Sequence, residues 1–344
     1  MSQFLRAQFA LLRQPIFISL LVTLVLLSPL LAIAIGTAKI GVLDVLDTYL
    51  CHLMAACSEP DLTQRIVWEL RTPRVILAFL TGAGLALAGA LLQTVTRNPL
   101  ADPYLFGVSN GASFGAVVVI STLGATVGVG MVMGAFIGSA ISVTIVMALA
   151  GRGVQIERML LAGVAVAYMF SAATSLVLYS SDPEVTVNYL FWALGSLARA
   201  EWNQLPLPFL VVGLGLLVTL AFHRQLRAVL SGEESAQTLG VNVSRLRLGM
   251  LFLASLMTAT LVAYTGGIGF IGLMIPHVVR RVMGVNNAKT LMATAMLGGL
   301  FLVWVDVVAR TLMENQEMPV GIITAGIGSL FFLAVLYRRR WIDG

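Results

Sequence analysis

Apolar residues occur along this chain in long, nearly unbroken runs separated by short polar segments. A helix that crosses about 30 Å of hydrocarbon needs roughly 20 such residues. The third and eighth runs, residues 105–123 and 268–283, are short or rich in glycine, which predicts broken or tilted helices there. The first run follows Arg6 and Arg13, as in a signal peptide, but exceeds the usual apolar core of about 7–15 residues and is expected to be retained. The pattern predicts ten transmembrane helices, over residues 16–36, 73–95, 105–123, 128–150, 158–180, 205–222, 247–265, 268–283, 290–310 and 319–337.

The composition requires lipid as the solvent. Of the 344 residues, 58% are hydrophobic and only 11% are charged, whereas soluble domains are about 45–50% apolar and about 25% charged. A soluble fold of this size could not bury so much apolar surface, because even large domains leave much of their surface in water. We therefore predict an all-α integral membrane protein with a single transmembrane domain over residues 1–344. A soluble enzyme, a nucleic-acid-binding protein and a disordered scaffold are excluded.

Basic residues gather in alternate segments between the spans. If the N-terminus is cytoplasmic, ten spans place both termini in the cytoplasm. Fifteen of the 21 lysines and arginines then lie inside, together with only five of the 16 acidic residues. A positive-inside bias of this kind sets the orientation of a membrane protein. The net charge of +5 therefore reflects topology rather than an anionic partner.

Small residues recur every four positions in two of the predicted spans. In lipid, apolarity alone cannot join helices, so faces of small residues that allow close approach drive their association. We expect two such packing faces, formed by Gly82, Ala86 and Ala90 in the second span and by Gly130, Gly134, Gly138 and Ser142 in the fourth.

Motifs for catalysis and for ion coupling are missing from the sequence. It contains no GxxxxGK[ST] or HExxH motif and only three histidines, so no enzymatic site, resident metal or cofactor is expected. Ion-coupled carriers usually bury an ionisable residue near the bilayer midplane. Here the one acidic residue within a long apolar run is Asp306, near a helix end with Arg310 one turn on, which is typical of a structural pair. An ion-coupled carrier is therefore disfavoured.

The polar segment 231–240 has the composition of a short helix outside the membrane. Ser231 and Glu234 have capping-box spacing, Glu233 and Glu234 suit a helix N-terminus, and Gly240 suits the end.

Cys51 and Cys57, the two cysteines of the chain, both fall in the first predicted outside loop. The bacterial periplasm is oxidising, so two nearby thiols there tend to pair. Within an intact helix, residues six apart point about 120° from each other, which opposes a bond. Ser58-Glu59-Pro60 can end the helix near Cys57 and bring it back. A disulfide, two buried free thiols, and haem iron held by His52 with a cysteine are the three alternatives.

Several motifs occur in a fixed order over most of the chain from Arg71 onward. They resemble those of the permease subunits of ABC importers for iron–siderophore complexes, haem and cobalamin, the FecCD-like family of type II importers. The matching stretches are Leu70-Arg71-Thr72-Pro73-Arg74, residues 82–93, Asn98-Pro99-Leu100-Ala101-Asp102-Pro103, residues 107–112, residues 160–165, Trp192-Ala193-Leu194-Gly195-Ser196, residues 232–240, Gly269-Phe270-Ile271-Gly272-Leu273 with Pro276-His277 and Arg280, and Pro319-Val320-Gly321.

The resemblance implies a FecCD-type permease fold and a homodimer with the pathway at the dimer axis. Two cytoplasmic ATP-binding cassette subunits and one periplasmic substrate-binding protein would complete the importer. The chain would be a transport subunit and not an enzyme, surrounded by membrane lipid as a multi-pass protein of the bacterial inner (cytoplasmic) membrane.

The resemblance also implies roles for named residues. The segment 231–240 would be a coupling helix that seats in a groove of the ATPase, through Gly232, Glu233, Ala236, Leu239 and Gly240. Carboxylates of the binding protein would dock on arginines of the outer face, here Arg71, Arg74 and Arg310. Arginine suits such paired recognition, although the same residues could instead anchor helices at the interface.

The family's inner gate corresponds to Gln155, Ile156 and Glu157, before and at the start of the fifth span. The family often has small hydroxyl residues there, so Ile156 and Glu157 depart from that pattern and leave the gate chemistry open. The resulting function is ATP-driven import of an iron chelate from periplasm to cytoplasm, with haem or cobalamin as the alternative and an ion-coupled carrier less favoured. No residue pattern identifies the chelate.

Overall fold

The computed structural model describes residues 2–38, 40–54, 61–123, 129–150, 156–284, 287–313 and 316–340. Within these ranges all regular structure is helical, and eight segments are long and apolar enough to cross a membrane. They are α1 (Ser2–Ala34), the continuous run of α3 (Leu62–Arg65), η1 (Ile66–Arg71) and α4 (Thr72–Val95), then α6 (Val129–Ala150), α7 (Ile156–Tyr179), the run of η3 (Trp202–Gln204) and α9 (Pro206–Ala221), α12 (Val243–Thr265), α14 (Ala288–Thr311) and α15 (Val320–Arg340).

The third and eighth predicted spans are the short ones, as expected. They form α5 (Val108–Leu123), with 16 residues, and α13 (Ile271–Met283), with 13 residues. At 1.5 Å per residue, α13 rises only about 20 Å and cannot cross the hydrocarbon by itself. The ten predicted spans are thus all present as helices, eight long and two short.

A non-helical stretch precedes α13 and is held by one tyrosine. Tyr104 belongs to the short helix η2 (Pro103–Phe106). Its hydroxyl donates to the Ile268 carbonyl oxygen at 3.0 Å and accepts from the Ile268 N–H at 2.9 Å. Phe270, the residue before α13, has a φ of +68°, which residues other than glycine rarely adopt. The break between α12 and α13 is therefore a fixed part of the fold.

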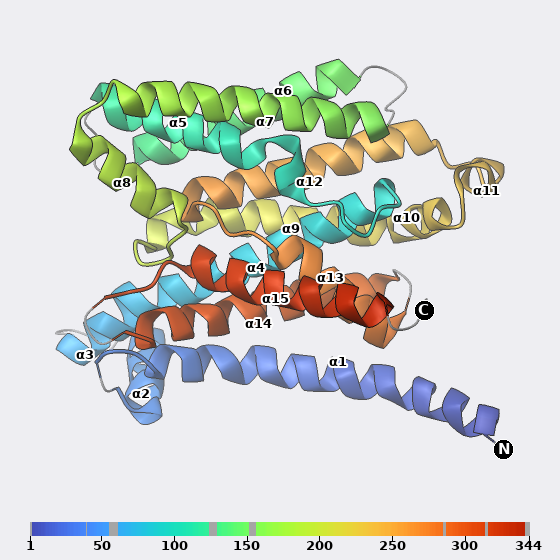
Figure 1. Ribbon diagram of the computed structural model, residues 1–344. Helices are drawn as coiled ribbons and strands as arrows, with labels where there is room; N and C mark the ends of the chain where they lie inside the picture. Colours follow the sequence, from blue (N-terminus) through green and yellow to red (C-terminus); the bar gives the residue numbers. More distant parts are fainter. Residues whose placement is uncertain are drawn as a thin grey trace.

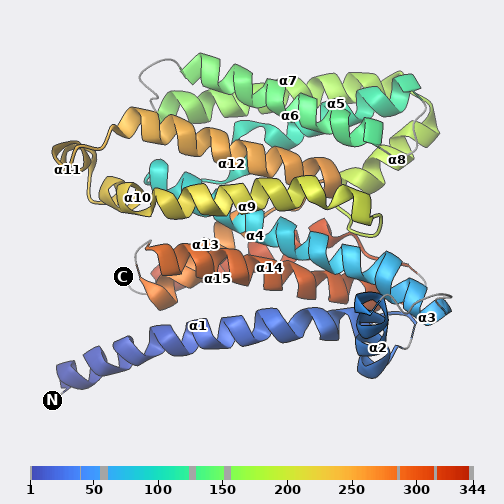
Figure 2. The same cartoon turned by 180° about the vertical axis from the view of Figure 1, so that it is seen from behind.

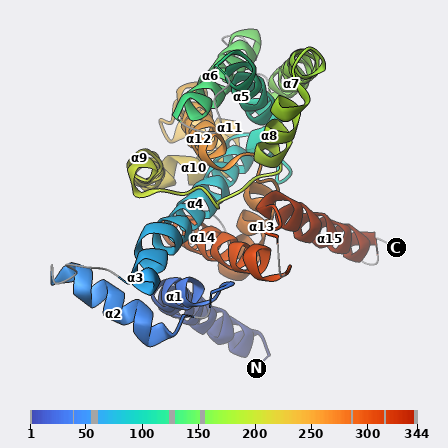
Figure 3. The same cartoon turned by 90° about the vertical axis from the view of Figure 1, so that its left-hand side faces the viewer.

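Helix α4 lies at the centre of the bundle. It packs against α14, α12, α13 and α9, and nearly all of its residues are buried. Figure 3, which looks along the bundle, shows α5, α6 and α7 grouped on one side of α12, and α1 beside α14 on the other side.

Four pairs of glycines bring helix backbones together at three crossings. A Cβ on Gly89 would overlap the backbone of Gly272, and a Cβ on Gly82 would overlap the Gly298 carbonyl. Helices α5 and α6 meet in the same way. The two predicted packing faces are confirmed at Gly82, Gly134, Gly138 and Ser142, while Gly130 has only an ordinary contact with Val119. The glycine pairs of α5 and α6 are Gly111 with Gly138 and Gly115 with Gly134.

The two ends of the bundle carry different short elements. Figures 1 and 2 show α11 (Glu233–Thr238), the start of α1 and the end of α15 at one end, called here the α11 end. The opposite end, called the α2 end, carries α2 (Val42–Leu53), α3 and α8 (Pro183–Ala193). An even number of crossings is the reason that both termini share one end. Helix α10 (His223–Leu230) leads from α9 into α11, and the one-turn helix η3 (Trp202–Gln204) precedes α9.

Candidate functional site

The polar segment at the α11 end forms the predicted short helix. Helix α11 starts after Gly232, with φ of +120°, and ends before Gly240, with φ of +79°. Both positive φ angles favour glycine, because a Cβ would come too close to the residue's own backbone. The predicted capping box is wrong: Gly232 is the N-cap, and Ser231 instead ends the preceding helix α10. Ser231 is the C-cap residue of α10, and for this reason it is not the N-cap of α11.

Helix α11 is fixed to the bundle by two of the five predicted coupling residues. The Ala236 side chain is fully buried in a cluster that includes Val243 and Leu246 of α12. Glu233 forms an ion pair with Arg247 of α12, a buried arginine whose Nε also donates to the Val95 carbonyl oxygen. Because a buried guanidinium needs compensation, this contact ties α11 to the ends of α12 and α4.

Of the remaining three coupling residues, Gly232 is the half-buried N-cap, and Leu239 and Gly240 form the outer surface of the segment. Leu239 is 72% exposed, and Gly240 is exposed beside it. Leu239 ends a helix that is anchored to the bundle, so its exposed apolar side chain gives a partner a rigid point of contact. The structure thus divides the predicted set into residues that hold the helix and residues that a partner can reach.

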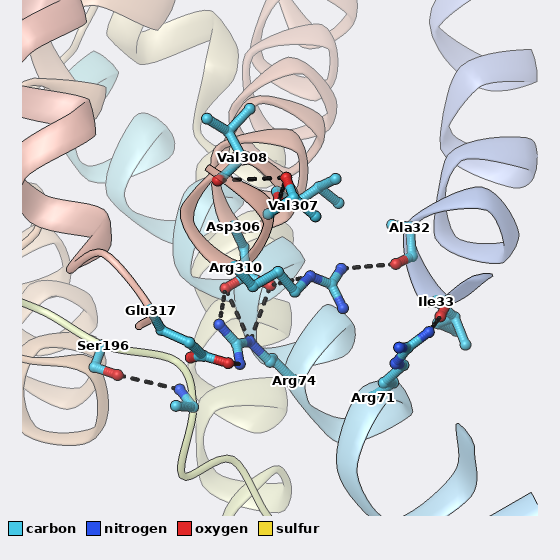
Figure 4. A network of polar contacts seen from close by, with 12 residues as sticks. Ala32, Ile33, Arg71, Arg74, Ser196, Asp306, Val307, Val308, Arg310 and Glu317 are labelled. Carbon is cyan, nitrogen blue, oxygen red and sulfur yellow. Dashed lines mark hydrogen bonds and ion pairs between the residues drawn. The ribbon is translucent and has the colours of Figure 1, made fainter. Parts of the chain in front are cut away.

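At the α2 end, Arg74 of α4 binds two carboxylates, Asp306 of α14 and Glu317 of the loop that follows α14 (Figure 4). Its Nε lies 2.9 and 3.1 Å from the two carboxylate oxygens of Asp306, and its Nη1 lies 2.9 Å from both oxygens of Glu317. Asp306 is fully buried, whereas the Glu317 side chain is 46% exposed. Charge-assisted, bidentate pairs of this geometry are among the stronger hydrogen bonds in proteins. Asp306 also lies 3.6 Å from Arg310, as the sequence spacing predicts.

Arg71 and Arg310 hold the end of α1. Arg71 Nη1 donates to the carbonyl oxygens of Ile33 at 2.7 Å and Ala34 at 2.9 Å. Arg310 donates to the Ala32 carbonyl oxygen at 2.7 Å. The last carbonyls of a helix have no partner within it, and these buried guanidinium groups satisfy them.

The structure therefore brings the three predicted docking arginines together in one cluster, but each is bound within its own chain. Arg71 and Arg310 are almost completely buried. These contacts describe the helix-anchoring alternative, and docking of a partner on these side chains stays a prediction. Arg74 reaches furthest outward, because the partially exposed Glu317 is its second ligand.

A cavity of about 440 Å³ opens beside this cluster. Its lining combines Arg74, Asp306 and Glu317 with apolar residues such as Trp192 and Tyr264 and with the loop of residues 196–201. Analysis of the sequence did not single out Glu317, because it lies in a polar loop and meets a residue 243 positions away.

The other predicted sites are described only in part. Gln155 lies outside the described residues, Ile156 begins α7, and Glu157 is exposed in the first turn of α7 at the α11 end. Cys51 is disulfide-bonded, and Cys57, the one other cysteine of the sequence, lies outside the described residues. His52 is stacked on Trp68 with ring centroids 4.1 Å apart, and its Nδ1 is 2.9 Å from the Thr48 carbonyl oxygen.

Comparison with known proteins agrees with this geometry. Residues 20–338 match the FecCD transport family, and the chain belongs to that family. It is 42% identical over 283 residues to the cobalamin import system permease protein BtuC of Halobacterium salinarum, covering 82% of this chain and 76% of that protein. It is 36% identical over 321 residues to the hemin transport system permease protein HmuU of Yersinia pestis, covering 92% and 95%.

A solved structure of an inward-facing ABC transporter, described as of the metal-chelate type, superimposes with a TM-score of 0.82. The match covers 94% of this chain and 99% of that one, at 29% identity. The chain is therefore a permease of the ABC-importer class, a multi-pass protein of the inner membrane and not an enzyme.

Proposed function

We propose that this FecCD-family chain is the membrane-spanning subunit of an ATP-driven importer for a metal chelate. The preferred cargo is an iron–siderophore complex, carried from periplasm to cytoplasm. Haem and cobalamin are the second candidates, because the relatives HmuU and BtuC are named for them. A second copy of the chain, two ATP-binding cassette subunits and a periplasmic binding protein complete the importer.

The observation that carries the proposal is the seating of α11. Ala236 and the Glu233–Arg247 ion pair fix it to the bundle, while Leu239 faces outward. A short helix attached in this way can transmit rigid-body motion of a partner without rearranging its own side chains. The α11 end would be cytoplasmic, since most of the basic residues fall there and basic residues collect on that side. The inner gate would lie at the same end, where residues 155–157 lead into α7.

Transport in proteoliposomes tests the function. The permease is reconstituted with its ATPase and binding protein, and uptake of radiolabelled ferric siderophore, haemin and cobalamin is compared. We expect accumulation of one of the three to require ATP hydrolysis and the binding protein. Uptake driven by a proton or sodium gradient without ATP would show instead that the chain is a secondary carrier.

Leu239→Asp tests the coupling role of α11. The change places a charge on the outward surface and leaves the Ala236 and Glu233 contacts intact, so we expect a folded permease that no longer retains its ATPase. Glu233→Arg is a poorer probe, because it would put a positive charge against Arg247 and disturb the seat itself. The measurement is co-purification of the ATPase together with ATP-driven uptake.

Leu123→Asp is the matched control. Leu123 is also 72% exposed, but it ends α5 at the α2 end. It should retain the ATPase as the wild type does. Equal retention in both variants would remove α11 from the coupling surface.

We further propose that the binding protein docks at the α2 end, on the surface around Arg71, Arg74 and Arg310. A carboxylate of the partner would compete with Glu317 for the outward side of Arg74. Glu317→Gln should therefore tighten the association, and Arg74→Gln should weaken it, with both differences shrinking at high salt. If affinity is indifferent to salt and to both changes, the arginines serve as helix anchors alone.

A further inference from the structure

Helix α2 lies across the bundle rather than along it. In Figure 1 the spanning helices run from side to side and α2 stands upright at one end, while Figure 3 shows it lengthwise at the rim beside α1. Tyr49 Oη is 2.9 Å from Thr72 Oγ1 at the start of α4, and the Tyr49 ring meets the edge of Trp68. Helix α2 is thus fixed perpendicular to the spans.

The residues of α2 divide into three faces. Val45 and Thr48 are fully buried against the bundle. Asp44 and Asp47 are exposed and form an acidic face. The third face is apolar and points away from the protein: at 100° per residue its members fall within about 100° of one another. They are Val42, Leu43, Leu46, Leu50 and Leu53, with exposed fractions of 39%, 79%, 40%, 51% and 81%.

The depth of α2 follows from α1. The apolar part of α1, Gln14–Ala34, has 21 residues and spans about 31 Å, which equals the thickness of a hydrocarbon core. Arg71 donates to the carbonyl oxygens of Ala34 and, at 2.8 Å, Ala38, so the chain that leads into α2 is held close to this end. Helix α2 therefore lies at the level where the hydrocarbon meets the headgroups.

The apolar face of α2 continues a lipid-facing surface. Leu27, Leu31 and Ile35 form an exposed stripe at the end of α1, and the apolar face of α2 begins seven residues beyond Ile35. A contiguous exposed apolar patch marks a membrane or protein contact. Its position at the rim, beside α1, indicates lipid as the occupant.

We propose that α2 is an interfacial helix, embedded in the leaflet at the α2 end of the protein. Its leucines insert among the upper parts of the acyl chains, and Asp44 and Asp47 face the water. Amphipathic helices bind membranes in this orientation. Through Tyr49 and Thr72, the lipid surface then fixes the depth of the start of α4, next to the arginine cluster.

A thiol-reactive NBD probe at single positions tests the proposal. The full-length permease carries Leu46→Cys or, as the matched control one residue on, Asp47→Cys, in nanodiscs of phosphatidylcholine and phosphatidylglycerol without partner proteins. Labelling is done without reductant, because Cys51 is disulfide-bonded, and the unmodified chain is the labelling blank. Quenching is measured with acyl-chain-brominated lipid and with aqueous iodide.

We expect brominated lipid to quench the probe at Leu46 roughly threefold more than the probe at Asp47, because an interfacial helix places its apolar face about 5–10 Å into the headgroup boundary. Iodide should show the opposite order. Val42→Cys, on the same apolar face, is the second probe position if Leu46→Cys does not fold. Equal iodide access at the apolar and acidic positions, with no quenching by brominated lipid, would overturn the proposal and show that this face lies in water.

Discussion

Replacing Asp306 by asparagine should destabilise the permease strongly. The Asp306 carboxylate is fully buried and faces Arg74 at 2.9 Å and Arg310 at 3.6 Å. Without it, in the cluster drawn in Figure 4, Arg74 keeps only Glu317 as a carboxylate ligand and Arg310 keeps none. Breaking a buried pair by removal of one partner costs about 3–5 kcal/mol, because the other charge is left uncompensated. Asparagine keeps the shape and one acceptor, so we expect a loss of about 3 kcal/mol.

The assay is the midpoint of thermal aggregation in detergent, read by size-exclusion chromatography after heating. A loss of about 3 kcal/mol corresponds to a shift on the order of 10 °C. Glu69→Gln is the matched control, since it removes the same charge from a surface pair with Arg65, at 3.8 Å, whose two side chains are 61% and 54% exposed. Exposed pairs contribute about 0–1 kcal/mol, so this variant should keep the wild-type midpoint.

A double variant separates charge from packing. Combining Asp306→Asn with Arg74→Gln removes a negative and a positive charge together, and should recover part of the lost stability. The reasoning is refuted if Asp306→Asn and Glu69→Gln lower the midpoint equally, or if the double variant is as unstable as the sum of its single changes.

Three further predictions concern the packing and the loops. Tyr104→Phe leaves the N–H and C=O of Ile268 without their partner and should cost about 1–3 kcal/mol; faster hydrogen exchange across residues 266–270 would show it. Gly89→Ala overpacks a helix crossing and should cost about 1–3 kcal/mol, whereas Gly249→Ala, where a Cβ meets open space, should be neutral or stabilising in the same thermal assay. Burial raises the pKa of the Asp102 carboxyl to about 6, so the folded state binds a proton that the unfolded state releases near pH 4, and stability should fall as pH rises through this window. Asp102→Asn should abolish that part of the pH dependence, as judged by wild-type and variant midpoints between pH 4.5 and 7.5.

The spans and their number were predictable from the sequence because each depends on local composition. The thickness of the bilayer sets the length of a span, and a helix satisfies its own backbone hydrogen bonds in lipid. The short α5 and α13 were visible for the same reason, as was the small-residue face of α6. Helix α11 was predictable from its polar composition and its flanking glycines, whose positive φ angles the structure confirms.

The roles of single residues within α11 depended on the tertiary structure. Exposure of Leu239 and burial of Ala236 follow from where α12 lies, which the segment itself does not encode. The predicted Ser231 cap failed because α10 ends on that residue. Local spacing cannot show which of two adjacent helices takes a shared residue.

The arginine cluster shows most clearly where the sequence stops being informative. The sequence indicated three arginines on the outer side, but it did not identify the groups that they bind. Arg71 meets a carbonyl 38 positions away, Arg74 a carboxylate 232 positions away, and Arg310 a carbonyl 278 positions away. The unpaired carbonyls at the end of α1 carry no sequence signal, because every residue has one. Only the packing of α1, α4 and α14 brings those groups within reach of the guanidinium ions, since burial of a charge is stable only where the fold supplies its partners.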